Sequence, residues 1–416
     1  MRPDRHFSRL LLGLTLALLA SSCTATPTPD GELVVPPSTE TVQTTTTTEP
    51  PTTTTTIEPT TTTIDPILEQ IEAMTLEDKI GQMLMPVLRG TGALTASAAD
   101  RSYNLALGGA ETPAELVIRY RLGGVMYLGP NVESPAQIAT FSAELQQAAG
   151  TAGLPPMFIA ADQEGGRVLR VKGEGITPIG SARSLAGDRD AVFQAGAITG
   201  TEMVAIGVNV VFAPVADVVR SDVGVIGNRS YGSDPIMVGE MVVAMIDGLQ
   251  QGGVGAVAKH WPGHGATEVD SHQALPTVTS TEEEWRRTDL PPFQRAVEAG
   301  VDAMMVGHLA LPNLDPVGQP ATISPILTDA LVRNDLQFAG VLFTDAMDMR
   351  ALDGIAEGEL AVRVIEAGLD ILLVPPDLSA AVAGIMGAIE TGRLDETRLD
   401  RSVERILRMK GDLGLL

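Results

Sequence analysis

Residues 255–265 read Gly-Ala-Val-Ala-Lys-His-Trp-Pro-Gly-His-Gly. The run Gly255–Ala258 is short and apolar, and it is followed at once by charged and aromatic residues. Such a run suits a strand that is buried on both faces, as the strands of a parallel sheet are. Ligands of parallel α/β folds bind at the carboxyl ends of the strands. The polar residues after Ala258 are therefore the first candidates for a functional site.

Seven more apolar runs of similar length lie along the chain, and stretches long enough for helices separate them. This alternation predicts an α/β fold, specifically a (β/α)8 TIM-type barrel, although an open doubly wound sheet stays possible because the number of strands does not show closure. The other strand candidates are Gln82–Leu88, Gly124–Leu128, Met157–Ala161, Val208–Ala213, Val301–Val306, Val341–Thr344 and Ile371–Val374. The helix candidates are Pro135–Ala149, Pro235–Gln251, Thr281–Ala299, Ser324–Asn334 and Glu357–Ala367, with Leu378–Glu390 and Asp395–Leu413 after the last strand.

The composition suits a buried core and restricts the partners. The 416-residue chain is 44% hydrophobic but only 3% aromatic, so its core must consist mainly of aliphatic side chains. The formal net charge of −24 argues against nucleic acid or an anionic membrane surface as a partner, because both would repel such a protein. An uncharged or locally steered substrate fits better.

The amino-terminal segment has the layout of an export signal. Arg2, Arg5 and Arg9 precede the apolar run Leu10–Ala20, which is short for a membrane span. The following Ala20-Ser21-Ser22-Cys23 resembles a bacterial lipobox, although Ala20 stands where Leu is usual. We therefore expect a signal peptide over residues 1–22 and lipidation of Cys23. The protein would then be an exported cell-envelope lipoprotein on the outer side of the cytoplasmic membrane; secretion with a free thiol and an uncleaved anchor are the alternatives.

Residues 23–65 form a segment dominated by Thr and Pro, including the runs Thr44–Thr48, Thr52–Thr56 and Thr60–Thr63. Such a segment has little apolar surface to bury and cannot offset the entropy of ordering it. We expect a disordered linker, with or without O-linked sugar. Residues 66–416 are expected to form one domain.

Polar residues follow several strand candidates, and a barrel would bring them to one face. Asp162 follows the third, Lys259 and His260 the fifth, and Asp345 the seventh, while Arg229 lies in the loop after the fourth. Each has a simpler explanation: Asp345 could cap the next helix, and a lysine is usually a solvated surface charge. Their position at the same end of different strands predicts a composite site.

A metal site is the first alternative to consider, because His260, His264 and His272 lie close together in the sequence. His260 and His264 have the spacing of a helical zinc pair, but Pro262-Gly263 between them breaks any helix. The spacing therefore does not place both rings on one face. We expect no metal and, with a single cysteine, no cysteine cage and no intrachain disulfide.

The stretch from Lys259 to His272 resembles the signature of glycoside hydrolase family 3, in its β-N-acetylglucosaminidase branch. The corresponding family stretch reads K-H-F-P-G-H-G and ends in D-S-H, so Trp261 stands here where Phe is usual. The resemblance covers roughly residues 67–410. Its other motifs are Asp162–Arg167, Phe212–Asp217, Asn228–Ser230 and Phe343–Met347.

The resemblance implies a retaining, double-displacement mechanism in a (β/α)8 barrel. After the barrel the sequence shows no second domain, so we expect no carboxyl-terminal sandwich domain, and we expect no cofactor. Asp345 would be the nucleophile, and His272 would be the proton donor and acceptor, paired with Asp270. The residues that would bind the sugar are Asp162, Arg170, Arg229, Lys259 and His260, whereas His264, His308 and Glu164 are left as structural. The implied substrate is terminal β-linked GlcNAc, in an exported enzyme most plausibly from GlcNAc–MurNAc fragments of peptidoglycan.

Three other functions stay open. A histidine acid/base does not repel an anionic nucleophile, so phosphate could replace water and make the enzyme a phosphorylase. A β-glucosidase or xylosidase of the same family would leave Asp270 and His272 unexplained. A non-catalytic surface sugar-binding protein would need no nucleophile, so the retained Asp345 argues against it. The oligomeric state is not predicted.

Overall fold

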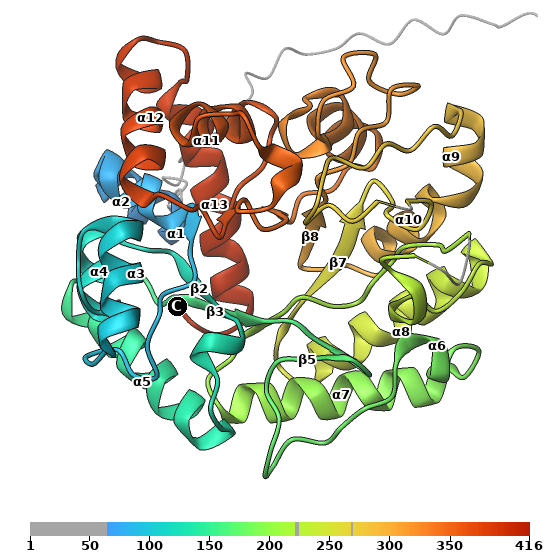
Figure 1. Ribbon diagram of the computed structural model, residues 1–416, viewed down its shortest axis with the longest axis horizontal. Helices are drawn as coiled ribbons and strands as arrows, with labels where there is room; N and C mark the ends of the chain where they lie inside the picture. The colour runs from blue at the N-terminus through green and yellow to red at the C-terminus, as the bar shows by residue number, and fades with distance from the viewer. Residues whose placement is uncertain (1–64, 221–223, 268) are drawn as a thin grey trace, which may run out of the picture. The chain divides into compact units, whose positions relative to one another are not determined.

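The computed structural model describes residues 65–220, 224–267 and 269–416 (Figure 1). The predicted signal peptide, the lipidation site Cys23 and residues 23–64 of the predicted linker lie outside the described residues. Within the described part, no helix combines the length and apolar composition that a membrane crossing requires.

The core of the fold is a six-stranded parallel sheet, which confirms the predicted α/β class. All six strands are buried, as their continuous apolar runs predict. In spatial order they are β2 (Gly124–Tyr127), β3 (Phe158–Ala161), β6 (Val210–Val211), β7 (Gly255–Trp261), β8 (Ala303–Val306) and β9 (Val341–Thr344).

A further parallel pair, β1 (Leu84–Met85) and β10 (Leu372–Leu373), hydrogen-bonds to both edges of this sheet. At one edge the N–H of Met126 donates to Pro86 O over 3.0 Å. At the other, the N–H of Thr344 donates to Ile371 O, also over 3.0 Å. The sheet is therefore curled, as a TIM-like fold requires. One hairpin, β4 (Gln163–Gly165) and β5 (Val168–Leu169), is antiparallel and was not predicted.

Helices α5, α7 and α8 lie outside the strands (Figure 1). The α-helices of the described residues are α1 (Pro66–Ala73), α2 (Leu76–Gln82), α3 (Ala98–Gly108), α4 (Pro113–Tyr120), α5 (Pro135–Thr151), α6 (Ala182–Leu185), α7 (Arg189–Ala205), α8 (Pro235–Gln251), α9 (Glu282–Thr288), α10 (Leu290–Glu298), α11 (Glu357–Glu366), α12 (Leu378–Glu390) and α13 (Glu396–Asp412). A π-helix, η4 (Ile326–Asp335), lies between β8 and β9.

The prediction of one helix over Thr281–Ala299 was wrong, because the segment forms α9 and α10 with a break at Asp289. The prolines Pro291 and Pro292 open α10, and a proline has no N–H with which to continue the hydrogen bonding of the preceding helix. Proline is tolerated in the first turn of a new helix. The chain therefore ends one helix and begins another at this point.

Glycines allow α7 and α8 to pack at close range. A Cβ at Gly252, just after α8, would lie 2.6 Å from the Cα of Gly200 in α7. Similarly, a Cβ at Gly248 would lie 2.3 Å from Phe193 O. Side chains larger than hydrogen would push the helices apart, so this contact explains why glycine occupies these helical positions despite its cost.

Lys410 in α13 is fully buried. Its Nζ donates to Gln82 Oε1 over 2.6 Å and lies 5.1 Å from the centroid of the Phe158 ring. Burial lowers the pKa of this ammonium to about 7. In the unfolded chain a lysine keeps a pKa near 10.4, so between about pH 7 and pH 10 the unfolded state binds more protons. The destabilising effect of this lysine therefore shrinks as the pH rises.

We expect Lys410→Met to raise the free energy of unfolding by a few kcal/mol at pH 7 and below. The gain should fall steadily toward zero as the pH rises past about 10.4, since only above that pH is the lysine neutral in both states. Urea unfolding at several pH values measures this, with the exposed Lys172→Met as control. A gain that does not change with pH would mean that packing rather than ionisation is responsible.

Candidate active site

A cavity of about 320 Å³ opens at the carboxyl ends of the strands. Asp162 follows β3, Lys259 and His260 end β7, and Asp345 follows β9. All of the predicted catalytic and sugar-binding residues line this cavity except Asp270, which is hydrogen-bonded to the cavity residue His272. The structure therefore brings the predicted residues together at one place.

One side of the cavity consists of five paired charged residues, which we call the ionic floor. Lys259 Nζ lies 2.7 Å from Asp162 Oδ1 and 2.6 Å from Glu164 Oε1. Arg229 donates through Nε and Nη2 to the two oxygens of Glu164, each over 2.8 Å. Arg170 Nη2 donates to Asp162 Oδ2 over 3.1 Å. Lys259 is 2% exposed, so it is not a solvated surface charge.

The pairing keeps the members of the ionic floor charged. Burial opposes the charge on Lys259, but Asp162 and Glu164 hold the pKa of its ammonium above the usual value. Burial also opposes ionisation of Glu164, yet Lys259 and Arg229 hold the pKa of its carboxyl well below its usual range. Glu164 therefore links two cations at the cavity wall, a position that the sequence alone did not reveal.

Asp217, after β6, is a further residue that the sequence analysis did not assign. It is fully buried, and its Oδ2 accepts from His260 Nδ1 over 2.7 Å. Its Oδ1 accepts from the N–H of His264 over 2.6 Å. Because a carboxylate can only accept, His260 carries its proton on Nδ1 and turns Nε2 toward Arg229, whose Nη2 is 3.5 Å away. Two features of the sequence could have identified Asp217 as a site residue: it follows a predicted strand, and it ends the family-like motif Phe212–Asp217.

Asp345 presents a buried carboxylate to the cavity. Its N–H donates to Val306 O over 2.8 Å, and its Oδ1 accepts from the N–H of Ala346 over 2.9 Å. Burial opposes ionisation, but His260, His308 and the Ala346 N–H hold the pKa of this carboxyl below its usual value. The group is therefore an anion near neutral pH, as a carboxylate nucleophile must be.

His308 supports the turn after Asp345. Its Nε2 lies 2.9 Å from Ala346 O, and because a carbonyl only accepts, this nitrogen donates. Its Nδ1 lies 2.9 Å from Thr322 Oγ1. The ring is fully buried and does not line the cavity. This arrangement is compatible with the structural role expected for His308.

His272 and Asp270 form a pair at the more exposed side of the cavity. The His272 side chain is 67% exposed, and its Nδ1 lies 2.8 Å from Asp270 Oδ1. Burial opposes ionisation of Asp270, but the hydrogen bonds from the His272 N–H and ring hold the pKa of its carboxyl below the usual value, so the carboxyl stays ionised. Nδ1 therefore donates to Asp270, and Nε2 is the ring atom available to a substrate.

The described residues contain no group of three or more His, Cys, Asp or Glu side chains that could hold a metal ion. His260 and His264, the pair with zinc-like spacing, instead meet edge to face with ring centroids 5.7 Å apart. His260 is bound to Asp217 and His264 to Thr267. Both rings thus have protein partners.

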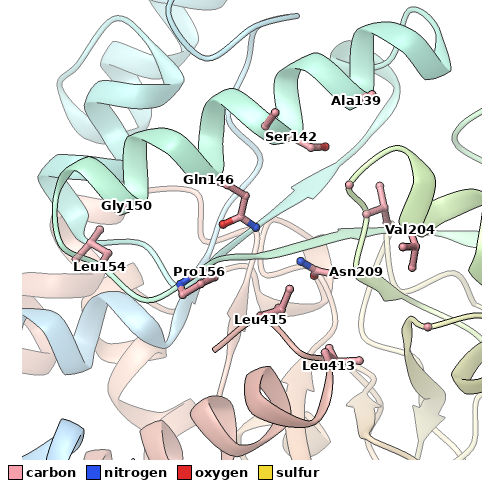
Figure 2. A pocket seen from close by; sticks show the side chains of 14 residues that line it. Ala139, Ser142, Gln146, Gly150, Leu154, Pro156, Val204, Asn209, Leu413 and Leu415 are labelled. Carbon is pink, nitrogen blue, oxygen red and sulfur yellow. The ribbon is translucent and has the colours of Figure 1, made fainter.

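A second, larger cavity of about 460 Å³ lies between α5, the end of α7 and the residues after α13 (Figure 2). None of the described residues that line it is charged. Gln146 exchanges two hydrogen bonds with the main chain of Met157, and Asn209 bonds to Ile159 N and Met157 O. Its amides are bonded to the main chain and the Ser142 hydroxyl to Tyr127 Oη, and no acid or base lines this cavity, so the candidate active site is the smaller one.

The chain matches the family model described as Glycosyl hydrolase family 3 N terminal domain over residues 75–409. It is 34% identical over 329 residues to Beta-hexosaminidase A of Pseudoalteromonas piscicida, covering 72% of this chain and 55% of that protein. It is 32% identical over 303 residues to Beta-hexosaminidase of Nitrosomonas eutropha, covering 69% of this chain and 85% of that protein. The solved structure of a glycoside hydrolase family 3 β-N-acetylglucosaminidase from Paenibacillus sp. FPU-7 is similar with a TM-score of 0.76 and 38% identity, covering 82% of this chain and 63% of that one. The chain thus spans little more than half of the first relative and most of the second.

Proposed function

The chain belongs to glycoside hydrolase family 3, and from this and the site we propose that it is a retaining exo-β-N-acetylglucosaminidase, or β-N-acetylhexosaminidase. It would remove terminal β-linked GlcNAc through a covalent intermediate on Asp345. The observation that carries this proposal is that one cavity is lined by an ionised buried carboxylate, Asp345, and by His272, which is hydrogen-bonded to the carboxylate of Asp270. These are the two kinds of group that a double displacement needs.

In the first step, a carboxylate oxygen of Asp345 bonds to the anomeric carbon while the glycosidic C–O bond breaks. The proton on His272 Nε2 passes to the departing oxygen, so the leaving group departs as a neutral alcohol. In the second step, a water molecule gives a proton back to Nε2 and bonds to the anomeric carbon, which releases Asp345. Asp270 stabilises the imidazolium form that the first step requires.

The ionic floor would bind the non-reducing sugar. Its charged groups present donors from Arg170, Arg229 and Lys259 and acceptors from Asp162 to the cavity, which matches the mixed donor and acceptor character of sugar hydroxyls. His260 joins this set through its contact with Arg229. Because the floor is already paired without a ligand, it needs little rearrangement to accept a sugar.

We extend the proposal to the whole chain. Residues 66–416 would form a single (β/α)8 domain, held by the linker of residues 23–65 to a lipid anchor on Cys23. The natural substrate would be a GlcNAc-containing glycan or muropeptide at the outer side of the cytoplasmic membrane. The predicted export signal and the lipobox-like residues support this placement.

Expression of the full chain in a bacterial host tests the anchor. We expect the mature protein to partition into detergent, and Cys23→Ala to release it into the aqueous phase or to block its processing. Phase partition and mass spectrometry of the amino-terminal peptide measure this. A wild-type protein that stays in the aqueous phase and begins at another residue would reject the lipid anchor without affecting the proposed chemistry.

Cleavage of a chromogenic β-GlcNAc substrate, with and without inorganic phosphate, tests the activity. We expect free GlcNAc at a rate that phosphate does not increase, and much slower cleavage of the matching β-glucoside and β-xyloside. GlcNAc-1-phosphate as the product would identify a phosphorylase instead. Binding of GlcNAc without any cleavage would identify a sugar-binding protein.

A further inference from the structure

Ser271 lies between the two members of the proposed acid/base pair, Asp270 and His272. It is 2% exposed, in contrast to its exposed neighbour His272. Its carbonyl oxygen accepts from the N–H of Ala351 over 3.2 Å, in the turn η5 (Arg350–Leu352). Its hydroxyl lies 3.5 Å from His264 Nε2, at the long end of the hydrogen-bonding range. Ser271 therefore attaches the segment that carries the pair to two different parts of the fold.

The partners of His264 fix the direction of this hydrogen bond. Thr267 Oγ1 donates to His264 O over 2.9 Å, so its single proton is in use and it can only accept from His264 Nδ1. Burial and the neighbouring His260 lower the pKa of the His264 ring, which is therefore neutral. A neutral ring protonated on Nδ1 has a lone pair on Nε2. The Ser271 hydroxyl is thus the donor, and His264 is its acceptor.

His264 in turn belongs to a series of contacts that begins at the ionic floor. Arg229 Nη2 lies 3.5 Å from His260 Nε2, and His260 Nδ1 donates to Asp217 Oδ2 over 2.7 Å. The other oxygen of Asp217 accepts from the N–H of His264 over 2.6 Å. Asp217 is fully buried, so this part of the series is shielded from water. The series connects the proposed sugar-binding side to the segment of residues 270–272.

We propose that Ser271 and His264 are positioning residues for the acid/base step: they hold His272 at a fixed place relative to the sugar-binding floor. The proposal rests on the proposed function, because it assigns His272 the proton transfer. A proton donor must reach the leaving oxygen at hydrogen-bonding distance, and small displacements are costly. The Ser271 hydroxyl supplies this restraint on an otherwise exposed histidine.

Ser271→Ala should therefore slow cleavage most for substrates whose leaving group needs a proton from His272. We expect a loss of about 10-fold in kcat/KM for a GlcNAc disaccharide and of less than about 3-fold for a dinitrophenyl β-GlcNAc. His264→Gln should show the same bias. The double variant should lose little more than the worse of the two single variants, because both changes remove one restraint.

Ser142→Ala is the matched control. Ser142 is 1% exposed and shares a hydrogen bond of 3.0 Å with Tyr127 Oη, but it lines the second cavity (Figure 2) rather than the active site. Ser142→Ala removes the same kind of buried hydroxyl as Ser271→Ala, but away from the active site, so we expect no bias between the two substrates. Thermal unfolding of each variant shows whether stability has changed.

Equal losses on both substrates in Ser271→Ala, or additive losses in the double variant, would overturn the positioning role and leave a structural one. The wild-type assay separates this result from failure of the proposed function. A wild type that does not cleave β-GlcNAc rejects the function itself. An active wild type with an unbiased Ser271→Ala rejects only the positioning role.

Discussion

Asp345→Asn is expected to lower kcat/KM for an aryl β-GlcNAc by at least about 10³-fold, equivalent to roughly 4 kcal/mol of transition-state stabilisation. The amide keeps the shape of the carboxyl group and can still accept from the Ala346 N–H. It lacks the negative charge that attacks the anomeric carbon. The loss should therefore fall on the chemical step, and the affinity for GlcNAc should change little.

Covalent labelling measures the same assignment directly. An activated fluoro-GlcNAc analogue should accumulate as an ester on Asp345, located by mass spectrometry of the digested protein. Asp353→Asn is the control. Asp353 is an exposed aspartate directly after the turn η5, and it does not line the cavity. A label on another carboxylate, or near-normal turnover by Asp345→Asn, would contradict the proposed nucleophile.

His272→Ala is expected to produce a loss that depends on the leaving group. A disaccharide needs a proton on the departing oxygen, so its cleavage should fall by about 10²-fold or more, whereas dinitrophenolate departs without one. With the activated substrate, the second step lacks its base, and the glycosyl-enzyme should accumulate. Azide needs no deprotonation and should partly restore turnover of that substrate. Steady-state kinetics on both substrates, with and without azide, measure these effects.

Asp270→Asn is expected to show a smaller effect of the same kind as His272→Ala. It removes the partner of Nδ1 but leaves the ring, so the same bias should appear in a milder form. If His272→Ala lowers kcat/KM equally for both substrates and azide has no effect, His272 has a role in binding or structure and another group transfers the proton.

The strands of this fold could be predicted because each buries both faces. Val341–Thr344 is continuous and apolar for that reason, and the structure forms β9 over the same residues. Both strands of the closing pair lie within predicted runs, but their pairing stayed open, because Leu84 and Leu372 lie at opposite ends of the domain sequence and no local pattern relates them. Helix α7 was not predicted: its apolar residues do not gather on one face, and glycines make its closest contact.

The sequence could predict which residues lie at the site but not which of them form ion pairs and hydrogen bonds with one another. Asp162 and Asp345 were found because they follow strands and Lys259 because it lies at the carboxyl end of one, and position along the chain is visible in a sequence. Their pairing depends on which side chains face one another across the sheet. The link from Lys259 to Glu164 and the burial of Asp217 beneath His260 therefore appeared only with the structure.

The shared partners of the ionic floor have a consequence for how this protein can diversify. Glu164 serves both Lys259 and Arg229, so its loss would take the paired carboxylate from Arg229 and leave Lys259 with Asp162 alone; breaking even one buried pair costs about 3–5 kcal/mol. A single replacement of Glu164, Lys259 or Arg229 is therefore costly, and simultaneous replacements would be needed to produce another working set. His272 is mostly exposed, and its ion pair is with Asp270 rather than with a member of the floor. We therefore expect related sequences to keep the same preference for the sugar that the floor binds. Their preference for the leaving group can change through single substitutions around His272.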